Sequence, residues 1–212
     1  MRYEVLSVTP LMQNCSLVWC PQTRQGAVID PGGESGRILQ WAEKASVDIR
    51  KIWLTHGHID HVGAAGALAA ATGAEIEGPG KADEFLLNGL DQQSRLFGVP
   101  LEGSFTPARW LAAGECVSIG QLEFEVRLCP GHTPGHVVFY HRNAAVVFVG
   151  DVLFHGSIGR TDFPGGDHDA LLTAIRDQLF PMGDAVTFVP GHGPEGTLGE
   201  ERMSNPFLRG RI

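Results

Sequence analysis

One seven-residue segment holds most of the side chains in this sequence that are suited to metal chemistry. Thr55-His56-Gly57-His58-Ile59-Asp60-His61 carries three imidazoles and a carboxylate directly after the apolar run Lys51–Leu54. In an extended chain, His56 and His58 project to the same side, and Gly57 leaves the space between them open, so both rings can reach one ion. Asp60 and His61, at the start of a helix, can turn towards a neighbouring point. The segment therefore predicts a metal site with room for two ions.

Three further residues of ligand type follow apolar runs later in the chain. Phe124–Leu128 leads to His132, Val146–Val149 leads to Asp151, and Thr187–Val189 leads to His192. Functional side chains commonly gather at the carboxyl ends of strands, where loops present them without interrupting the sheet. We therefore expect four strand ends to share one site.

The elements that must position this site alternate between short strands and helices. Runs of β-branched and aromatic residues between glycine and proline turns predict strands at 3–8, 16–19, 27–29, 51–54, 74–77, 116–119, 121–127, 137–140, 145–149 and 186–189. Apolar residues at helical spacing predict helices at 34–45, 62–71, 82–97 and 168–179. Two strand-rich halves with interspersed helices favour an αββα sandwich of two mixed β-sheets flanked by helices over a doubly wound parallel sheet.

Length and composition indicate one acidic domain. The 212 residues carry 16 Lys plus Arg against 24 Asp plus Glu, a formal net charge of -8, and no linker divides the chain. We therefore expect a single domain over 1–212 that binds neither nucleic acid nor a membrane. No apolar run approaches the roughly 18 residues of a membrane span, and the first ten residues lack a signal-peptide pattern, so a cytoplasmic location is expected. The four cysteines form no CxxC pair and are expected to be buried and reduced.

Taken in order, the motifs resemble those of the metallo-β-lactamase superfamily. The match comprises Asp30-Pro31-Gly32, the segment Thr55 to His61, the PGHTPGH segment around His132, Gly150-Asp151 and the PGHG segment at His192. The resemblance implies the αββα fold and a dinuclear centre of two divalent metal ions, with zinc, iron or manganese all acceptable. It implies that the first ion binds His56, His58 and His132, that the second binds Asp60, His61 and His192, and that Asp151 bridges both.

Within the superfamily, the residues after Asp151 resemble the glyoxalase II group, particularly its compact bacterial members. GDVLF at 150–154 and GSIGRTDF at 156–163 carry this likeness, and Asp in place of Cys at 151 argues against the true β-lactamases. The resemblance implies a hydrolase of glutathione thioesters (a hydroxyacylglutathione hydrolase) that uses a metal-bridging hydroxide. Asp60 would orient that hydroxide, and Asp151 would hold both ions in place. Arg160 occupies the basic position that contacts glutathione in the family.

Departures from the glyoxalase II pattern leave other functions open. Only Gly193–Ile212 follow the last histidine motif, so the full C-terminal helical region that binds glutathione in the family is expected to be lacking. Pro194 and Asp162 stand where the family has a tyrosine and an aromatic residue. The GRTDF segment also suits a persulfide dioxygenase with a single Fe(II). A lactonase-type hydrolase and a non-catalytic binding module are further alternatives; in each enzymatic case the partner is a small-molecule substrate.

Four other histidines and one aspartate receive different expectations. Asp30, directly before Pro-Gly, is either a support for the histidine-rich loop or an ordinary turn residue. His136 is expected to be a hydrogen-bonded loop residue and His168 to lie in the first turn of a helix. Neither these two nor His141 and His155 are expected to bind metal.

Overall fold

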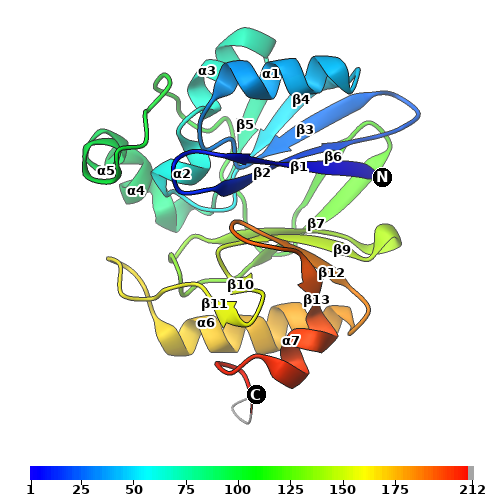
Figure 1. Ribbon diagram of the computed structural model, residues 1–212, viewed down its shortest axis with the longest axis vertical. Coiled ribbons are helices and arrows are strands. Elements are labelled where there is room, and N and C mark those ends of the chain that lie inside the picture. The colour runs from blue at the N-terminus through cyan, green and yellow to red at the C-terminus, as the bar shows by residue number, and fades with distance from the viewer. Residues whose placement is uncertain (210–212) are drawn as a thin grey trace.

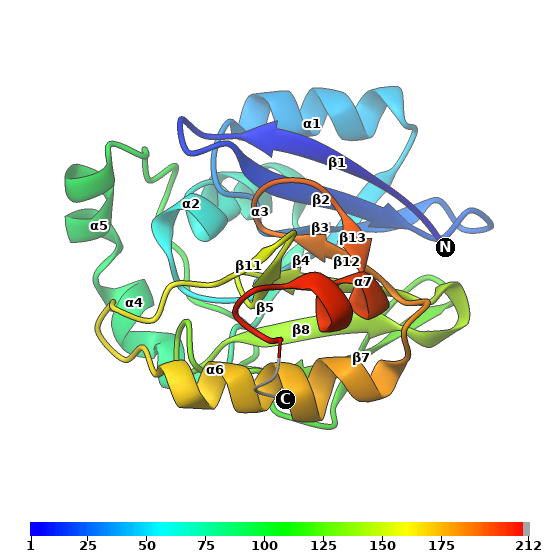
Figure 2. The ribbon, with the colours of Figure 1, turned by 60° about the horizontal axis from the view of Figure 1, so that its bottom comes forward.

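Two β-sheets packed face to face form the centre of the molecule, and helices cover both outer faces (Figure 1). The computed structural model describes residues 1–209. In Figure 1 the order from top to bottom is helix, sheet, sheet and helix, and Figure 2 shows helix α6 lying along the outer side of the second sheet. The predicted αββα sandwich is confirmed.

The first sheet is built entirely from the N-terminal part of the chain, in the order β1-β2-β3-β4-β5. Its strands are β1 (Arg2–Val8), β2 (Gln13–Trp19), β3 (Gln25–Ile29), β4 (Asp48–Trp53) and β5 (Glu75–Glu77). The first three form an antiparallel meander, whereas β3, β4 and β5 run parallel. Parallel neighbours need crossover connections, which here contain α1 (Ser35–Lys44) and, after the short α2 (Ile59–Val62), α3 (Ala65–Thr72).

The second sheet has the order β13-β12-β9-β8-β7-β6. Its strands are β6 (Cys116–Ile119), β7 (Leu122–Leu128), β8 (Val137–His141), β9 (Val146–Gly150), β12 (Thr187–Pro190) and β13 (Gly196–Thr197). All neighbours are antiparallel except β9 and β12, which are joined through α6 (His168–Ala174) and its π-helical continuation Ile175–Leu179. A small hairpin, β10 (Leu153–Phe154) with β11 (Ser157–Ile158), and helix α7 (Leu198–Ser204) complete this half.

Aromatic side chains fill the space between the two sheets. Trp53, at the end of β4, is fully buried and stacks on Phe139, with ring centroids 5.5 Å apart. Its other neighbour is Phe124, whose ring meets it edge-on at 5.0 Å. The Trp53 Nε1 atom donates a hydrogen bond of 2.9 Å to Glu77. This inter-sheet core fixes the end of β4, the strand that leads into the histidine-rich loop.

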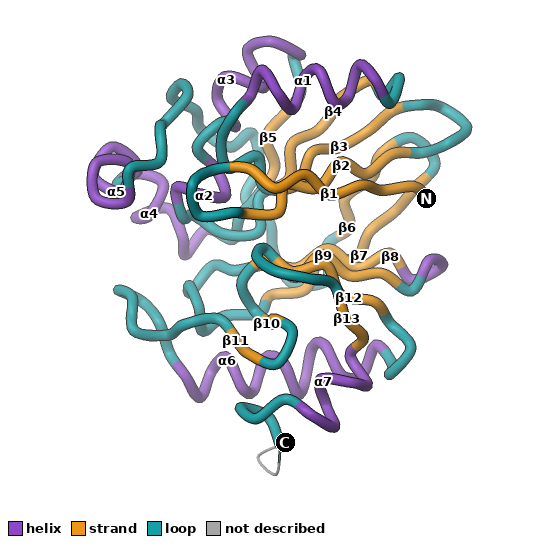
Figure 3. Tube along the Cα trace, in the orientation of Figure 1, coloured by secondary structure: helices purple, strands orange, loops and turns teal. Residues whose placement is uncertain are grey.

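The structure divides one of the predicted helices and shortens another. The helix expected at 82–97 is a 3-10 turn, Lys81–Asp83, followed by α4 (Glu84–Asn88) and α5 (Leu90–Phe97), with Gly89 at the break. Glycine in a helix interior costs about 1 kcal/mol relative to alanine, which favours a break at this point. The helix expected at 62–71 begins later, as α3 (Ala65–Thr72), and Val62 is the last residue of the separate short helix α2. Figure 3 shows α4 and α5 as separate turns to one side of the sandwich.

Three of the four cysteines are in the state that the sequence predicts, and one is not. Cys15, Cys20 and Cys129 are buried and free as predicted, but Cys116 is exposed. It lies on edge strand β6 with its side chain opposite to that of buried Val117, so the alternation of the strand turns it to solvent.

No sequence pattern predicts the short elements β10, β11, β13 and α7. In residues 1–209, no helix has the length and apolar character needed to cross a membrane.

Candidate metal centre

Four loops bring all seven predicted ligands to one end of the sandwich. β4 of the first sheet precedes the loop of His56 to His61, whereas β7, β9 and β12 of the second sheet precede His132, Asp151 and His192. β9 and β12 are parallel neighbours, so their carboxyl ends lie side by side. The two sheets therefore supply different sides of one site, as the strand-end argument predicts.

His56, His58 and His132 direct ring nitrogens towards one another. His58 Nδ1 lies 3.1 Å from His56 Nε2 and 3.0 Å from His132 Nε2. The opposite nitrogens are engaged elsewhere: His132 Nδ1 donates to the Arg160 carbonyl at 2.7 Å, and His56 Nδ1 lies 3.0 Å from the Thr55 hydroxyl, whose own proton goes to a carboxylate. The two Nε2 atoms therefore present lone pairs, the form of imidazole that binds a cation.

Burial keeps these three rings neutral. It is the main cause that lowers the pKa of His56 well below its usual range and that of His58 to about 3, and the neighbouring imidazoles add to the effect. Burial also lowers the pKa of His132, although the charge of Asp151 opposes it. Metal binding at neutral pH would therefore displace no proton from this group.

Asp60, His61 and His192 form a second group beside the first. Asp60 Oδ2 lies 3.2 Å from His192 Nε2 and 3.8 Å from His61 Nε2. His192 Nδ1 donates to the carbonyl of Leu11, in the turn between β1 and β2, at 3.1 Å. This bond fixes the ring with Nε2 facing Asp60, so residues of the first sheet orient a histidine of the second.

Asp151 lies between the two groups and faces both. Its Oδ1 is 3.3 Å from His61 Nε2, and its Oδ2 is 3.7 Å from His132 Nε2 and 3.8 Å from His192 Nε2. Burial opposes ionisation of Asp151, but the charge of His61 outweighs it and holds the pKa far below its usual range. A Cβ at Gly191 would overlap Asp151 Oδ1 and the His61 ring, so the PGHG motif requires glycine at this position.

Two buried atoms at the centre of the site lack hydrogen-bond partners. They are His61 Nε2 and Asp151 Oδ1, which face each other. Buried polar atoms of this kind are costly unless a cation or proton binds between them. The carboxylates of Asp151 and Asp60 outweigh burial and raise the pKa of His61, so a proton and a metal ion compete for Nε2. Imidazole and carboxylate donors suit zinc, iron or manganese, and the residues present therefore fit a divalent metal centre.

Asp30 supports the histidine-rich loop from the end of β3. Its backbone has φ 52°, and its buried carboxylate accepts three hydrogen bonds. Oδ1 accepts from the Thr55 backbone N–H at 2.7 Å, while Oδ2 accepts from the Thr55 hydroxyl at 2.6 Å and from His61 Nδ1 at 2.9 Å. Asp30 thereby fixes the tautomer of His61 that leaves Nε2 free. The structure therefore favours the supporting role of Asp30 over that of an ordinary turn residue.

Replacing Asp30 tests this support. In Asp30→Asn, the amide can accept on one side only, so an NH₂ group faces either the Thr55 N–H or the pair formed by the Thr55 hydroxyl and His61. We expect metal affinity about 10- to 100-fold lower in competition with a chromophoric chelator, as for other residues that orient metal ligands. Asp48→Asn, which changes an exposed carboxylate, is the control. Equal affinities in the two variants would contradict the role of Asp30.

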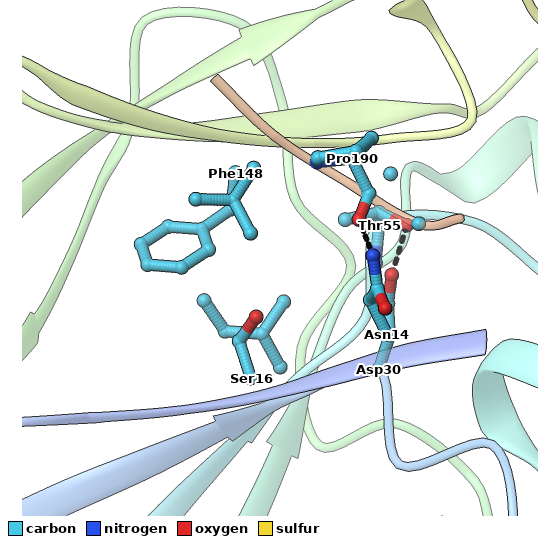
Figure 4. Close-up of a pocket in the computed structure, with 10 residues that line it drawn as sticks. Asn14, Ser16, Asp30, Thr55, Phe148 and Pro190 are labelled. Carbon is cyan, nitrogen blue, oxygen red and sulfur yellow. Dashed lines mark hydrogen bonds between the residues drawn. The ribbon is translucent and has the colours of Figure 1, made fainter. Parts of the chain in front are cut away.

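Asn14 joins the two sheets at the site, although no sequence motif marks it. It stands in β2, where its backbone N–H donates to Gly191 O at 2.7 Å and its amide donates to the carbonyls of Pro190 at 3.1 Å and Gly193 at 2.8 Å. Figure 4 shows Asn14 beside Pro190 and Asp30 beside Thr55, on one side of a cavity of about 10 Å³ between the sheets. The cavity is too small for a substrate. Asn14 holds the loop that presents His192.

The remaining histidines behave as expected. His136 is buried, its Nε2 accepts from the Asp151 backbone N–H at 3.1 Å, and its ring stacks on His56 at 4.7 Å. His168 is the first residue of α6. His141 accepts from the Ala144 backbone N–H, and His155 lies 3.2 Å from Glu201. Across residues 1–209, none of the four joins a converging group of metal-type ligands.

A cleft of about 730 Å³ opens onto the site. His58, Asp60, His132, Asp151 and His192 form its polar floor. Its walls are largely apolar and come from α4, from α5, from the β10–β11 hairpin and from the loop that follows this hairpin. A small molecule in this cleft can reach both groups of ligands.

Arg160 lines the cleft, but its guanidinium is engaged within the chain. Nε and Nη2 each donate a hydrogen bond of 2.7 Å to the carboxylate of Asp162, and both side chains are exposed. The guanidinium also lies over the Phe163 ring, 4.1 Å from its centroid. Arg160 is thus at the predicted place, in an internal pair that a substrate carboxylate would have to join or displace.

Comparison with known proteins agrees with this arrangement. Residues 8–192 match the family model of the metallo-beta-lactamase superfamily. The chain is 44% identical, over the full length of both proteins, to the hydroxyacylglutathione hydrolase GloC of Haemophilus influenzae. The crystal structure of BLEG-1 B3 metallo-beta-lactamase superimposes with a TM-score of 0.91 at 33% identity, covering 99% of this chain and 100% of that one. A di-iron-bound structure of TTHA1623 gives 0.88 at 37% identity, with coverage of 97% and 100%. The fold and the order of the site motifs thus agree with the family match, and this chain belongs to the metallo-beta-lactamase superfamily.

Proposed function

We propose that this protein is a metal-dependent hydrolase of glutathione thioesters, of the hydroxyacylglutathione hydrolase type. The observation that carries the proposal is the convergence of seven imidazole and carboxylate side chains on the floor of one open cleft. The similarity to GloC over the whole chain supports the choice of substrate. The similarity to a di-iron protein supports a centre of two divalent ions.

The ligands divide between two ions in this proposal. His56, His58 and His132 would hold the first ion, Asp60, His61 and His192 the second, and Asp151 would contact both. Ions bound there would lower the pKa of a shared water towards 7 and polarise a substrate carbonyl. Zinc, iron and manganese all accept this set of nitrogen and oxygen ligands.

The side chains of the floor have separate tasks in hydrolysis. The net reaction forms a bond between a water oxygen and the carbonyl carbon and breaks the carbon–sulfur bond, releasing an acid and a thiol. Asp60 stands on the cleft floor, and its contacts with His61 and His192 outweigh burial and lower its pKa, so its carboxylate can orient a water by accepting a hydrogen bond from it. Asp151 holds the two halves of the site together. A thiol is acidic enough to leave without a strong general acid.

Arg160 is the residue we propose for contact with a glutathione carboxylate. A guanidinium offers a planar fork that suits such a group, and Arg160 is exposed at the cleft. The bond to Asp162 holds the side chain in place. A carboxylate would then approach the guanidinium edge that Asp162 does not use.

The test of the function is hydrolysis of S-lactoylglutathione with and without oxygen. We expect metal-loaded protein to turn this thioester over at equal rates in air and under anaerobic conditions, measured by loss of thioester absorbance. Oxygen uptake on glutathione persulfide with no thioester hydrolysis would show the single-iron dioxygenase instead. A β-lactam belongs in the same assay because of the likeness to BLEG-1. Faster turnover of the β-lactam than of the thioester would overturn the proposal.

A further inference from the structure

Exposed apolar side chains are concentrated at the mouth of the cleft. Within residues 1–209 the exposed large apolar residues are Leu11, Met12, Phe85, Leu96, Phe97, Met203 and Phe207. Four of these residues line the cleft, namely Leu11, Phe85, Leu96 and Phe97, and Met12 adjoins Leu11. Exposed apolar groups gathered around a concave site commonly mark a ligand surface.

An aromatic wall connects this rim with the floor of the site. The Phe163 ring lies edge-on to His58, with centroids 5.2 Å apart, and the Phe97 ring meets Phe163 edge-on at 6.2 Å. Phe85 and Leu96 extend the same side of the cleft. We call these four residues, Phe85, Leu96, Phe97 and Phe163, the apolar wall. Because the wall begins beside His58, a group packed on it must be attached close to the reacting carbon.

The wall offers a cation to the charged arm of a glutathione thioester only at Phe163, beneath Arg160, and none at Phe85, Leu96 or Phe97. Glutathione carries two carboxylates, and the one Lys or Arg side chain among the described residues of the lining is Arg160, already paired with Asp162. The acyl arm of the substrate has no need of a cationic partner. We propose that the apolar wall is an acyl subsite and that the preferred substrates are thioesters with an aryl or branched alkyl group next to the carbonyl. This proposal rests on the thioester hydrolysis proposed above.

Two substrates that differ only in the acyl group test the subsite. S-mandeloylglutathione has a phenyl group where S-lactoylglutathione has a methyl group. Because the phenyl group buries more apolar surface, we expect kcat/KM to be about tenfold higher for the mandeloyl substrate. Phe97→Ala should lower kcat/KM for the mandeloyl substrate at least about fivefold more than for the lactoyl substrate. Phe207→Ala, which removes a similarly exposed ring outside the cleft lining, should keep the preference.

The outcomes separate this inference from the proposed function. Hydrolysis of both substrates with equal kcat/KM would overturn the acyl subsite and leave the proposed function intact. If neither thioester is hydrolysed, the proposed function fails, and the wall is then tested by calorimetric binding of mandelate and lactate to the metal-loaded protein. Tighter binding of mandelate that Phe97→Ala abolishes supports an apolar subsite, and equal binding contradicts it.

A separate observation concerns Asp83, a buried carboxylate outside every motif. It ends the 3-10 turn Lys81–Asp83 and has no exposed surface. Its Oδ2 accepts from the Gly57 backbone N–H at 3.0 Å and from the Thr133 hydroxyl at 2.7 Å. Its Oδ1 accepts from the Gly135 backbone N–H at 2.6 Å. Gly57 lies between His56 and His58, and Thr133 follows His132, so one carboxylate joins both loops of the three-histidine group.

Glycines allow this close approach. A Cβ at Gly135 would collide with the Gly80 carbonyl and with Asp83, and a Cβ at Gly57 would collide with Leu86 of α4. Gly57 is therefore required for packing against α4, which is a different reason from the open space between imidazoles that the sequence suggested. The Gly80 N–H also donates to the Gly135 carbonyl at 2.8 Å. The segment before α4 is thus fastened to both ligand loops.

We infer that Asp83 is a positioning residue that sets the geometry of His56, His58 and His132. All three of its partners are donors, so only a side chain with two acceptor oxygens satisfies them. Asparagine has nearly the same shape but must turn an NH₂ group towards a donor. Asp83→Asn therefore removes the constraint with a minimal change in volume.

The test measures the metal affinity of each site rather than turnover. Apo-protein is titrated with zinc at pH 8 in competition with a chromophoric chelator, which gives an affinity for each of the two sites. In Asp83→Asn, one of these affinities should be about 10- to 100-fold weaker than in the wild type, and the other should be unchanged. Asp91→Asn, an exposed carboxylate on α5, should match the wild type. Thr133→Ser keeps the hydroxyl and should also bind normally. A lower melting temperature of Asp83→Asn with two unchanged affinities would show a merely structural role and overturn the inference.

Discussion

Asp151→Ala should reduce both metal content and activity more than any other single change in the site. Asp151 faces His61, His132 and His192, so its removal leaves both groups of ligands incomplete. We expect bound metal to fall from near two ions per chain to below one, and kcat/KM for S-lactoylglutathione to fall at least about 10³-fold. Metal analysis by mass spectrometry and steady-state kinetics measure the two effects.

His192→Ala distinguishes a bridging residue from a ligand of one ion. Its Nε2 faces Asp60 at 3.2 Å and is remote from the His56–His58–His132 contacts, so one ion per chain should remain. Asp169→Ala, an exposed carboxylate on α6, is the matched control and should retain the metal content of the wild type. Undiminished metal in Asp151→Ala, or the same loss in all three variants, would refute the assignment of Asp151.

Trp53→Ala should cause the largest loss of stability. The side chain is fully buried between the sheets, where it packs on Phe124 and Phe139. Truncating a buried aromatic residue costs about 3–5 kcal/mol, which for a chain of this size lowers the melting temperature by roughly 10 °C. Equilibrium unfolding in urea, followed by circular dichroism on metal-loaded protein, measures the free energy of unfolding.

Two tryptophan variants calibrate this loss. Trp53→Phe keeps most of the ring and removes the bond to Glu77, so it should cost only about 1 kcal/mol beyond the lost ring volume. Trp110→Ala removes a half-buried ring that lies beneath Lys81, and it should cost much less than Trp53→Ala. A Trp53→Ala protein as stable as Trp110→Ala would mean that the inter-sheet aromatic core does not hold the sandwich together.

The convergence of the candidate ligands could be predicted because few residue types are suited to binding a metal ion. His132, Asp151 and His192 each lie in the loop after a strand, and that local pattern is visible in the sequence. Their convergence follows from a general property of sheets, namely that loops at one end of neighbouring strands meet. The sandwich itself follows from alternating strand and helix patterns. These features depend on residues that are close together in the chain.

The supporting residues could not be predicted because their partners are distant in the sequence. Asp83 contacts residues 57, 133 and 135, and Asn14 contacts residues 190, 191 and 193. An aspartate in an expected helix and an asparagine between two expected strands look like ordinary surface residues. The hairpin β10–β11 and strand β13 have only two residues per strand, too few for a period-two pattern to be visible.

The division of the ligand set between the two sheets has a consequence for the newly made chain. All strands of the first sheet lie within residues 2–77, whereas His132, Asp151 and His192 follow in the second half. At roughly 5–20 residues per second, His61 leaves the ribosome on the order of ten seconds before His192 does. During that interval the growing chain presents three histidines and Asp60 without the partners that complete either group. The seven side chains that the proposed centre requires are therefore together only once the second half of the chain has been made.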